Sequence, residues 1–192
     1  MWTPLLSADA IAARIRELGG QLSAAYAGEE LVLLGLLQGG LFFLAELARA
    51  VALPVRIETL RPQSYFGGTA SSGRVALEPA PALDIGGRHV VVVDDIYDSG
   101  RTLARVRDHL ASLAPRSLEF ACLLVKDAPR VRPFEVRYRL FEIPNVFVVG
   151  CGLDLDGLGR NLPGVWAWPD GASEQAARAQ LLAQLRSPGE VH

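Results

Sequence analysis

Four consecutive valines, Val90–Val93, are followed directly by two acids, Asp94 and Asp95. A β-branched run without polar alternation predicts a strand that is buried on both faces, and such strands belong to parallel sheets covered by helices on each side. An unpaired carboxylate is not tolerated inside such a strand. We therefore expect the strand to end at the two acids and to present them to a cleft.

Apolar runs of strand type alternate along the chain with segments whose apolar residues recur at helical spacing. Helices are expected over Ser7–Tyr26, Leu41–Ala52, Thr102–Leu113 and Ala172–Arg186. Strands are expected over Leu31–Leu37, Pro54–Leu60, Val90–Asp95, Ser117–Lys126, Val136–Ile143 and Asn145–Leu153. This order predicts an α/β fold with a central, mostly parallel sheet flanked by helices. Ligands of such folds bind beyond the carboxyl ends of the strands.

Composition favours one compact globular domain. The chain has 192 residues, of which 50% are hydrophobic, enough for a sizeable core. We expect a single domain over residues 1–170 and a helical extension with a tail over 171–192. The formal net charge of −2 lacks the basic field that nucleic-acid binding needs. No apolar run could cross a bilayer and no signal peptide is evident, so a cytoplasmic protein without membrane or nucleic-acid partners is expected.

The two cysteines, Cys122 and Cys151, lie in apolar, strand-like surroundings. Neither belongs to a CxxC motif or to histidine-rich spacing, so buried thiols are expected in place of a disulfide or a metal site.

The segment Arg61–Gly87 departs from the alternation, because it is rich in Gly, Ser, Thr, Pro and Ala. Long loops in compact domains are often functional lids. Composition alone leaves open whether this one is a lid or a plain connection.

A turn after the two acids has the features of a phosphate site. Its sequence, DSGRT, covers Asp98–Thr102 and leads into the expected helix. A helix N-terminus offers free N–H groups and the positive end of the helix dipole, glycine permits close approach of the backbone, and the hydroxyls are further donors. Carboxylates just upstream suit the vicinal hydroxyls of a sugar. The ligand implied is a sugar phosphate, and the absence of GxxxxGK[ST] excludes a Walker-type loop.

The stretch VVVVDDIYDSGRTL resembles the phosphoribosyl-pyrophosphate (PRPP) signature of the type I phosphoribosyltransferases. Other segments narrow the resemblance to the hypoxanthine-guanine phosphoribosyltransferases: LVLLGLLQGGLFFLAELAR, LLVKDAPR and IPNVFVVGCGLDLDGLGRNLP. It implies the type I fold, with a small hood lobe formed by the terminal segments. QSYFGGTASSG resembles the flexible catalytic loop, whose Ser64 and Tyr65 would close on the reacting centre.

The resemblance implies roles around the sugar. Asp94 and Asp95 would hold the ribose hydroxyls. The 5′-phosphate would be bound by Ser99, Gly100, Arg101 and Thr102.

The resemblance also implies a pyrophosphate site with Mg²⁺ as cofactor. Gln38, Gly39 and Arg160 would contact pyrophosphate, and Asp154 and Asp94 would hold the metal ion. The cation and a positive side chain would neutralise the leaving group.

The resemblance also implies which residues contact the purine. By resemblance, Asp98 would be the general base, Phe147 would stack on the base, Ile96 would flank it, and the main chain of Val148 would meet its Watson–Crick edge. Lys126 would donate to the 6-oxo group, and an ammonium, which has no acceptor, should reject the 6-amino group of adenine. The implied reaction makes IMP or GMP from PRPP, with pyrophosphate as product.

Three positions depart from the family pattern. Gln38 stands where a basic residue is usual, Asp94 where many members have Glu, and Cys151 where an aromatic residue is common. These departures bear on efficiency and base preference more than on the reaction class.

Other functions remain to be weighed. An enzyme preferring xanthine would share all the catalytic residues, and differences around Val148–Gly152 would decide. RNA-binding regulators of the same fold carry Tyr where Asp98 stands and favour a basic face. A DNA-binding repressor needs a separate domain for which the residues before Leu31 leave no room. Family resemblance implies a homodimer or homotetramer.

Overall fold

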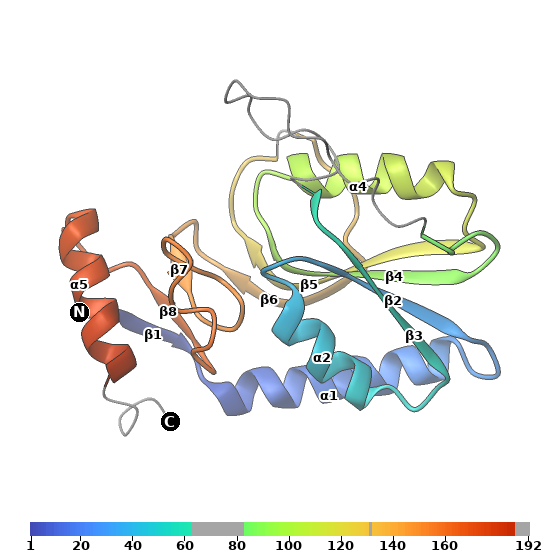
Figure 1. The fold of residues 1–192 in the computed structure, drawn as a ribbon, viewed down its shortest axis with the longest axis horizontal. Helices are drawn as coiled ribbons and strands as arrows, with labels where there is room; N and C mark the ends of the chain where they lie inside the picture. The colour runs from blue at the N-terminus through green and yellow to red at the C-terminus, as the bar shows by residue number, and fades with distance from the viewer. Residues whose placement is uncertain (63–82, 131, 187–192) are drawn as a thin grey trace.

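A five-stranded parallel sheet forms the centre of the molecule. The computed structural model describes residues 1–62, 83–130 and 132–186 (Figure 1). The strands follow the order β3-β2-β4-β5-β6. They are β2 (Leu31–Leu36), β3 (Val55–Leu60), β4 (His89–Tyr97), β5 (Ser117–Lys126) and β6 (Tyr138–Ile143). The predicted α/β fold is confirmed, because every pairing within this sheet is parallel.

Helices cover both faces of the sheet, as the unbroken valine run requires. α1 (Ala8–Ala25) and α2 (Leu41–Ala50) lie on one face, and α4 (Arg101–Ser112) lies on the other (Figure 1). Val91 and Val93 of β4 share a core with α1 and α2, whereas Val90 and Val92 share a second core with α4. The predicted helices differ from the observed ones only by one or two residues at their ends.

The strand that carries the two acids is longer than predicted. β4 runs through Asp94 and Asp95 and ends at Tyr97, because β5 continues to pair with it: Asp94 lies opposite Cys122 and Tyr97 opposite Val125. The expectation that the strand ends at the acids is therefore wrong. The main chain stays in the ladder, and only the side chains depart from the core pattern.

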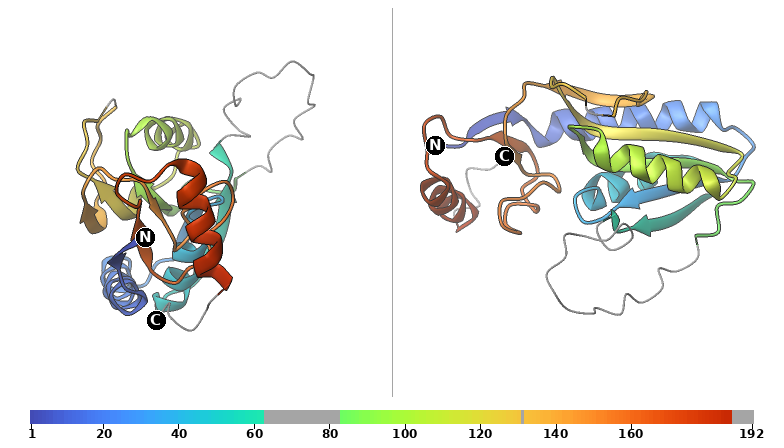
Figure 2. Two further views of the ribbon diagram at one scale, coloured as in Figure 1. Left: turned by 90° about the vertical axis from the view of Figure 1, so that its left-hand side faces the viewer. Right: turned by 90° about the horizontal axis from the view of Figure 1, so that it is seen from above.

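A small lobe stands beside the main sheet (Figures 1 and 2). It contains a three-stranded antiparallel sheet, with the order β1-β8-β7, and the helix α5. These elements are β1 (Thr3–Leu6), β7 (Val148–Val149), β8 (Val165–Ala167) and α5 (Glu174–Arg186). The strand predicted over Asn145–Leu153 is wrong in length and in sheet. Positive φ angles at Gly150, Cys151 and Gly152 turn the chain after only two residues.

Both cysteines are free and buried, as expected. In the described ranges, every helix is too short or too polar to cross a bilayer. Ser64, Tyr65 and most of Arg61–Gly87 lie outside the described residues. The division of the chain at residue 170 stays a prediction.

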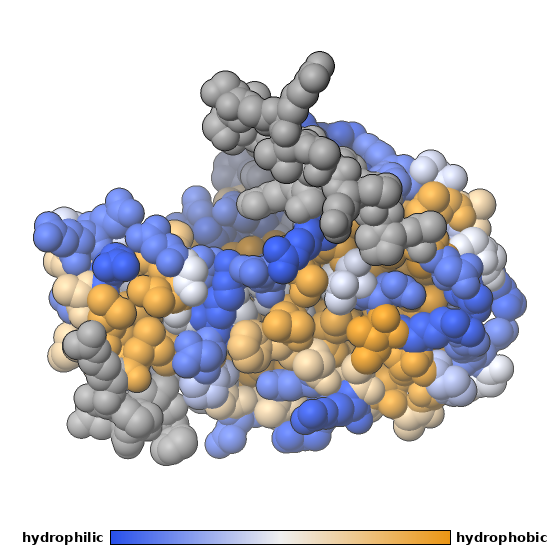
Figure 3. Space-filling model, viewed as in Figure 1, coloured by the Kyte–Doolittle hydropathy of each residue, from blue (hydrophilic) through white to orange (hydrophobic). Residues whose placement is uncertain are grey.

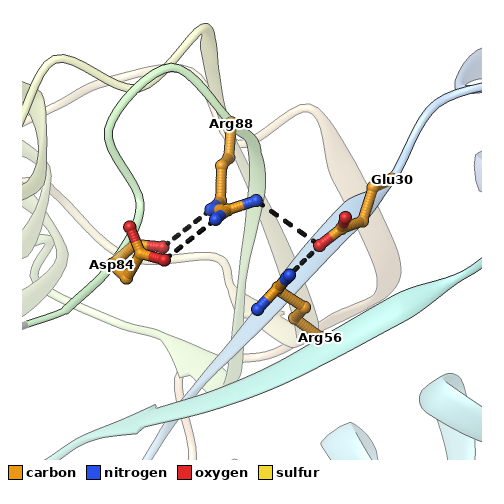
Figure 4. Close-up of polar contacts among 4 residues, drawn as sticks. All are labelled: Glu30, Arg56, Asp84 and Arg88. Atoms are coloured by element: carbon orange, nitrogen blue, oxygen red, sulfur yellow. Dashed lines mark hydrogen bonds and ion pairs between the residues drawn. The ribbon is translucent and has the colours of Figure 1, made fainter.

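Ion pairs join the strand starts at the end of the sheet opposite the acids (Figure 4). Glu30, just before β2, pairs with Arg56 of β3, and it lies 3.5 Å from Arg88, which precedes β4. Arg88 also contacts Asp84 at 2.9 Å. Exposed pairs of this kind contribute little stability each, so the network adds little to the free energy of unfolding.

Candidate active site

The carboxyl end of the parallel sheet brings together polar residues from three strands. β2 leads into Gln38 and Gly39, β4 carries Asp94 and Asp95 and leads into Asp98, and β5 ends at Lys126. The fold gathers these residues because parallel strands expose their carboxyl ends at one edge.

Asp94 and Asp95 form an acidic pair in which Asp94 is buried and Asp95 is partly buried. Asp94 is only 9% exposed. Burial and the neighbouring Asp95 carboxyl raise the pKa of Asp94 well above its usual range. Burial raises the pKa of Asp95 as well, while a hydrogen bond with Asp94 and the charge of Arg160 act in the opposite direction. Both acids would be ionised more easily beside a cation or donor hydroxyls.

Gly39 closes one side of this pair. A Cβ at Gly39 would lie 1.7 Å from Oδ2 of Asp95, so a side chain here would displace the carboxylate. On the other side, a Cβ at Gly152 would lie 2.0 Å from the carbonyl oxygen of Gly39. The peptide bond between Leu37 and Gln38 is cis. The loop after β2 is thus held between the acids and the small lobe by main-chain contact.

The predicted phosphate turn has the geometry of an anion site. Gly100 has a φ of +79° and α4 begins at Arg101. Because glycine has no capping side chain, the N–H groups of the first helical turn remain available to a phosphate. A Cβ at Gly100 would lie 2.6 Å from the carbonyl oxygen of Arg132, so both the φ angle and the close packing favour glycine.

Asp98 and Lys126 meet across the site. Lys126 Nζ lies 3.3 Å from Asp98 Oδ2, and the lysine side chain is 12% exposed. The Lys126 side chain is therefore mostly covered and does not extend into solvent. The two groups predicted to contact the purine lie side by side.

Arg130 joins the segments that carry this pair, a role that sequence reasoning missed. Its guanidinium donates to the carbonyl oxygens of Asp98, at 2.6 Å, and of Lys126. It also lies 4.3 Å from the centre of the Tyr97 ring. The only available signal was its position in KDAPR, four residues after Lys126.

The predicted base-binding residues of the small lobe differ in exposure. Val148 is buried, whereas Phe147 is 44% exposed. Ile96 packs against the core that contains Val148. Phe147 is therefore not an ordinary core residue, and its ring is available for contact with a ligand.

Asp154 and Arg160 form an ion pair, with Nη2 and Oδ1 2.6 Å apart. Arg160 also donates to the carbonyl oxygen of Gly152 at 2.5 Å, and Asp154 accepts from the N–H of Gly157 at 2.7 Å. Since the charge of Arg160 affects the pKa of Asp95, the small lobe reaches the acids of the main sheet.

No group of three His, Cys, Asp or Glu side chains in the described residues could hold a metal ion. Asp94, Asp95 and Asp154 thus do not form a three-ligand cluster. Mg²⁺ usually binds one or two carboxylates together with substrate phosphates and water. Asp94 of the main sheet and Asp154 of the small lobe fit that mode of binding.

Comparison with known proteins places these features in context. Residues 1–156 match the family model described as a phosphoribosyl transferase domain. Helix α5 lies beyond that match.

Curated relatives named hypoxanthine-guanine phosphoribosyltransferase include one from Streptococcus pneumoniae. It is 42% identical over 159 residues, which are 83% of this chain and 88% of the relative. One from Mycobacterium avium is 42% identical over 164 residues, 82% of this chain and 81% of the relative. A crystal structure of a protein of that name from Bacillus anthracis matches with a TM-score of 0.75 and 33% identity, covering 86% of this chain and 96% of that one.

Proposed function

The chain belongs to the hypoxanthine-guanine phosphoribosyltransferase family, and from that premise we propose that its site transfers the 5-phosphoribosyl group of PRPP to a 6-oxopurine. The products are the purine nucleotide and pyrophosphate. The observation that carries this proposal is the contact of 3.3 Å between Lys126 and Asp98, next to the turn that begins α4.

PRPP lies along the carboxyl end of the sheet. Its 5′-phosphate binds the N–H groups and hydroxyls of the Ser99–Thr102 turn. Its ribose hydroxyls donate hydrogen bonds to Asp94 and Asp95. These hydrogen bonds stabilise the ionised form of the two carboxyls. The charge of Arg160, close to these acids, and the main chain at Gly39 bind the pyrophosphate. Gln38 carries no charge, so its contribution to pyrophosphate binding is weaker than that of a basic residue.

Transfer replaces one bond to the anomeric carbon by another. The bond from this carbon to pyrophosphate oxygen breaks, and a bond to a purine nitrogen forms. Asp98 accepts the proton that this nitrogen loses. Position matters first for such a base, and its proximity to Lys126 supports the assignment. Ser64 and Tyr65 lie outside the described residues, and the family resemblance implies that they would close on the reacting centre.

Mg²⁺ is the cofactor of this reaction. When bound, it neutralises the negative charge that develops on pyrophosphate. Asp94 and Asp154 would hold it, with PRPP oxygens completing its ligands.

Purine selectivity follows from Lys126. Its ammonium donates to the 6-oxo group and leaves a 6-amino group without an acceptor. Phe147 stacks on the base, Ile96 flanks it, and the main chain of Val148 meets its Watson–Crick edge. An enzyme that prefers xanthine would use the same groups, and the residues around Cys151 would decide between the bases.

Self-association accompanies this function. Leu41, Phe42 and Ile57 are 47%, 37% and 57% exposed, and apolar side chains gather on the face that carries α2 and β3 (Figure 3). Water contact with such a patch is unfavourable. A homodimer formed through this face would cover it.

Nucleotide formation from PRPP and Mg²⁺ tests the proposal, with hypoxanthine, guanine, xanthine and adenine assayed in parallel. We expect turnover of 6-oxopurines and none of adenine. Asp98→Asn should lower kcat by about 10²-fold or more, because the general base is lost. Asp127→Asn is the matched control, since this exposed acid directly follows Lys126.

Failure to turn over any purine, with PRPP still bound, would overturn the enzymatic function and favour a regulator of the same fold. A turnover of xanthine well above that of hypoxanthine and guanine would favour an enzyme that prefers xanthine.

A further inference from the structure

Phe147 is held by a second aromatic residue, Trp168. The two ring centres are 5.3 Å apart and the ring planes are inclined by 85°. Trp168 also donates its main-chain N–H to the carbonyl oxygen of Phe147 at 2.8 Å. An edge-to-face contact fixes the tilt of a ring without stacking on it. Since 44% of Phe147 remains exposed, the ring is both oriented and open.

Trp168 is itself fixed from two sides. Its Nε1 donates to the carbonyl oxygen of Ala172 at 3.3 Å, just before α5. The ring of Trp2, at the N-terminal end of the chain, meets it edge to face at 5.6 Å. Two segments far apart in sequence therefore determine where Trp168 lies.

Helix α5 anchors Trp2. The Nε1 of Trp2 donates to the carbonyl oxygen of Ala177 at 3.0 Å, and this bond is buried. Ala177 and Leu181 of α5 are fully buried in one core with Trp2 and Trp166. Figure 1 and both views of Figure 2 draw the N-terminus beside α5.

We propose that α5, Trp2 and Trp168 position the ring of Phe147 and thereby set the affinity of the site for the purine base. Trp168 is a positioning residue, because it acts through Phe147. This role rests on the proposed function, in which Phe147 stacks on the base. Helix α5 of the C-terminal extension lies beyond the family match. In this proposal it supports the residues that contact the base.

Trp168→Leu tests this role, because it removes the ring that fixes Phe147. We expect the KM for hypoxanthine and the Kd for GMP, measured by titration calorimetry, to rise about threefold to tenfold, the range of an aromatic pair. The KM for PRPP should change less than twofold, because the sugar and phosphate groups lie on the main sheet. Trp168→Phe keeps an aromatic ring and should restore part of the loss.

Two further variants test the remote support. Trp2→Phe keeps a ring but removes the hydrogen bond to Ala177. Leu181→Ala leaves a cavity in the core beneath α5. Both should raise the KM for the base in the same direction as Trp168→Leu. Tyr26→Leu is the control, since Tyr26 is a buried aromatic residue that contacts His89 at the opposite end of the sheet. It should lower Tm without changing the KM for the base.

The outcomes separate the two proposals. If the wild-type enzyme is active, an unchanged KM for the base and an unchanged GMP affinity in Trp168→Leu, Trp2→Phe and Leu181→Ala would overturn the positioning role alone. Equal rises in the KM for the base and for PRPP would overturn it too, because they indicate a general loss of structure. A wild-type protein that neither forms nucleotide nor binds GMP would overturn the proposed function and this role with it.

Discussion

The Asp94 carboxyl meets opposite demands in the free protein and in the complex. In the free protein, burial and the nearby Asp95 raise its pKa, which means that folding disfavours the ionised form. In the proposed complex with PRPP, hydroxyl donors and a cation would favour the ionised form. Binding of PRPP would then offset the cost of ionising Asp94 in the folded protein.

The stability of the free protein should therefore depend on pH through Asp94. Below the aspartate pKa of the unfolded chain, the acid is protonated in both states and its burial carries no ionisation penalty. As pH rises through the raised folded pKa, this stability is lost. We expect Tm to fall as the pH rises from about 4, the ordinary pKa of aspartate, toward neutral and higher pH.

Asp94→Asn should flatten this pH dependence and raise Tm near pH 8, while weakening PRPP binding. Scanning calorimetry at several pH values measures the first effect. A wild-type Tm that increases toward pH 8 would contradict the prediction.

In the proposed function, Lys126 sets the selectivity between purine bases. Lys126→Gln replaces a donor-only ammonium by an amide that can also accept. We expect kcat/KM for hypoxanthine to fall about tenfold or more, since a charge-assisted hydrogen bond is lost. The ratio of adenine to hypoxanthine turnover should rise. Steady-state kinetics with both bases measures this ratio, and an unchanged ratio would mean that another group reads position 6.

At the scale of elements, both the positive φ angle and the close packing of the turn between β4 and α4 favour glycine at Gly100. Gly100→Ala should lower stability by about 1–2 kcal/mol, because a side chain is strained at positive φ. It should also raise the KM for PRPP, since the new Cβ displaces the Arg132 main chain beside the phosphate turn. Gly87→Ala is the control: its φ is +68° and nothing lies within 4 Å of the added Cβ. A similar KM in both variants would show that packing at Gly100 is irrelevant to binding.

The main elements could be predicted from the sequence because each carries a pattern of its own. The valine run of β4 and the apolar spacing of α1 are local signals. β1, β7 and β8 have only two to four residues, too few for a period to be recognised. Their pairing depends on contacts between the two ends of the chain, which no local pattern contains.

The candidate site shows the same division. Asp98, Lys126 and the Ser99–Thr102 turn stand at the carboxyl ends of parallel strands, where ligands are expected, and the family resemblance predicted their roles. Arg130 and Trp168 act through main-chain carbonyls and ring edges. Such contacts depend on distances of a few ångströms in the folded chain, and composition or spacing does not encode them visibly.

At the scale of the whole molecule, the proposed homodimer would cover the face that carries α2 and β3. Phe42→Glu places a charge in the exposed patch and should shift the protein toward monomer. Analytical ultracentrifugation measures the mass. Gln21→Glu adds the same charge on an exposed part of α1 and should leave the mass unchanged. A monomeric wild-type protein would contradict the proposed self-association.

The contact between Gly152 and Gly39 has a consequence for how this protein can evolve. A Cβ at Gly152 would overlap the carbonyl oxygen of Gly39, and a Cβ at Gly39 would overlap the Asp95 carboxylate. At Gly152 the neighbouring atoms belong to the main chain of Gly39 and cannot yield, and at Gly39 a larger residue would have to displace the Asp95 carboxylate. Saturation mutagenesis should find both positions intolerant even of alanine. Each lobe thereby restricts which substitutions the other can accept. New base specificities must therefore arise from substitutions at positions other than Gly39 and Gly152.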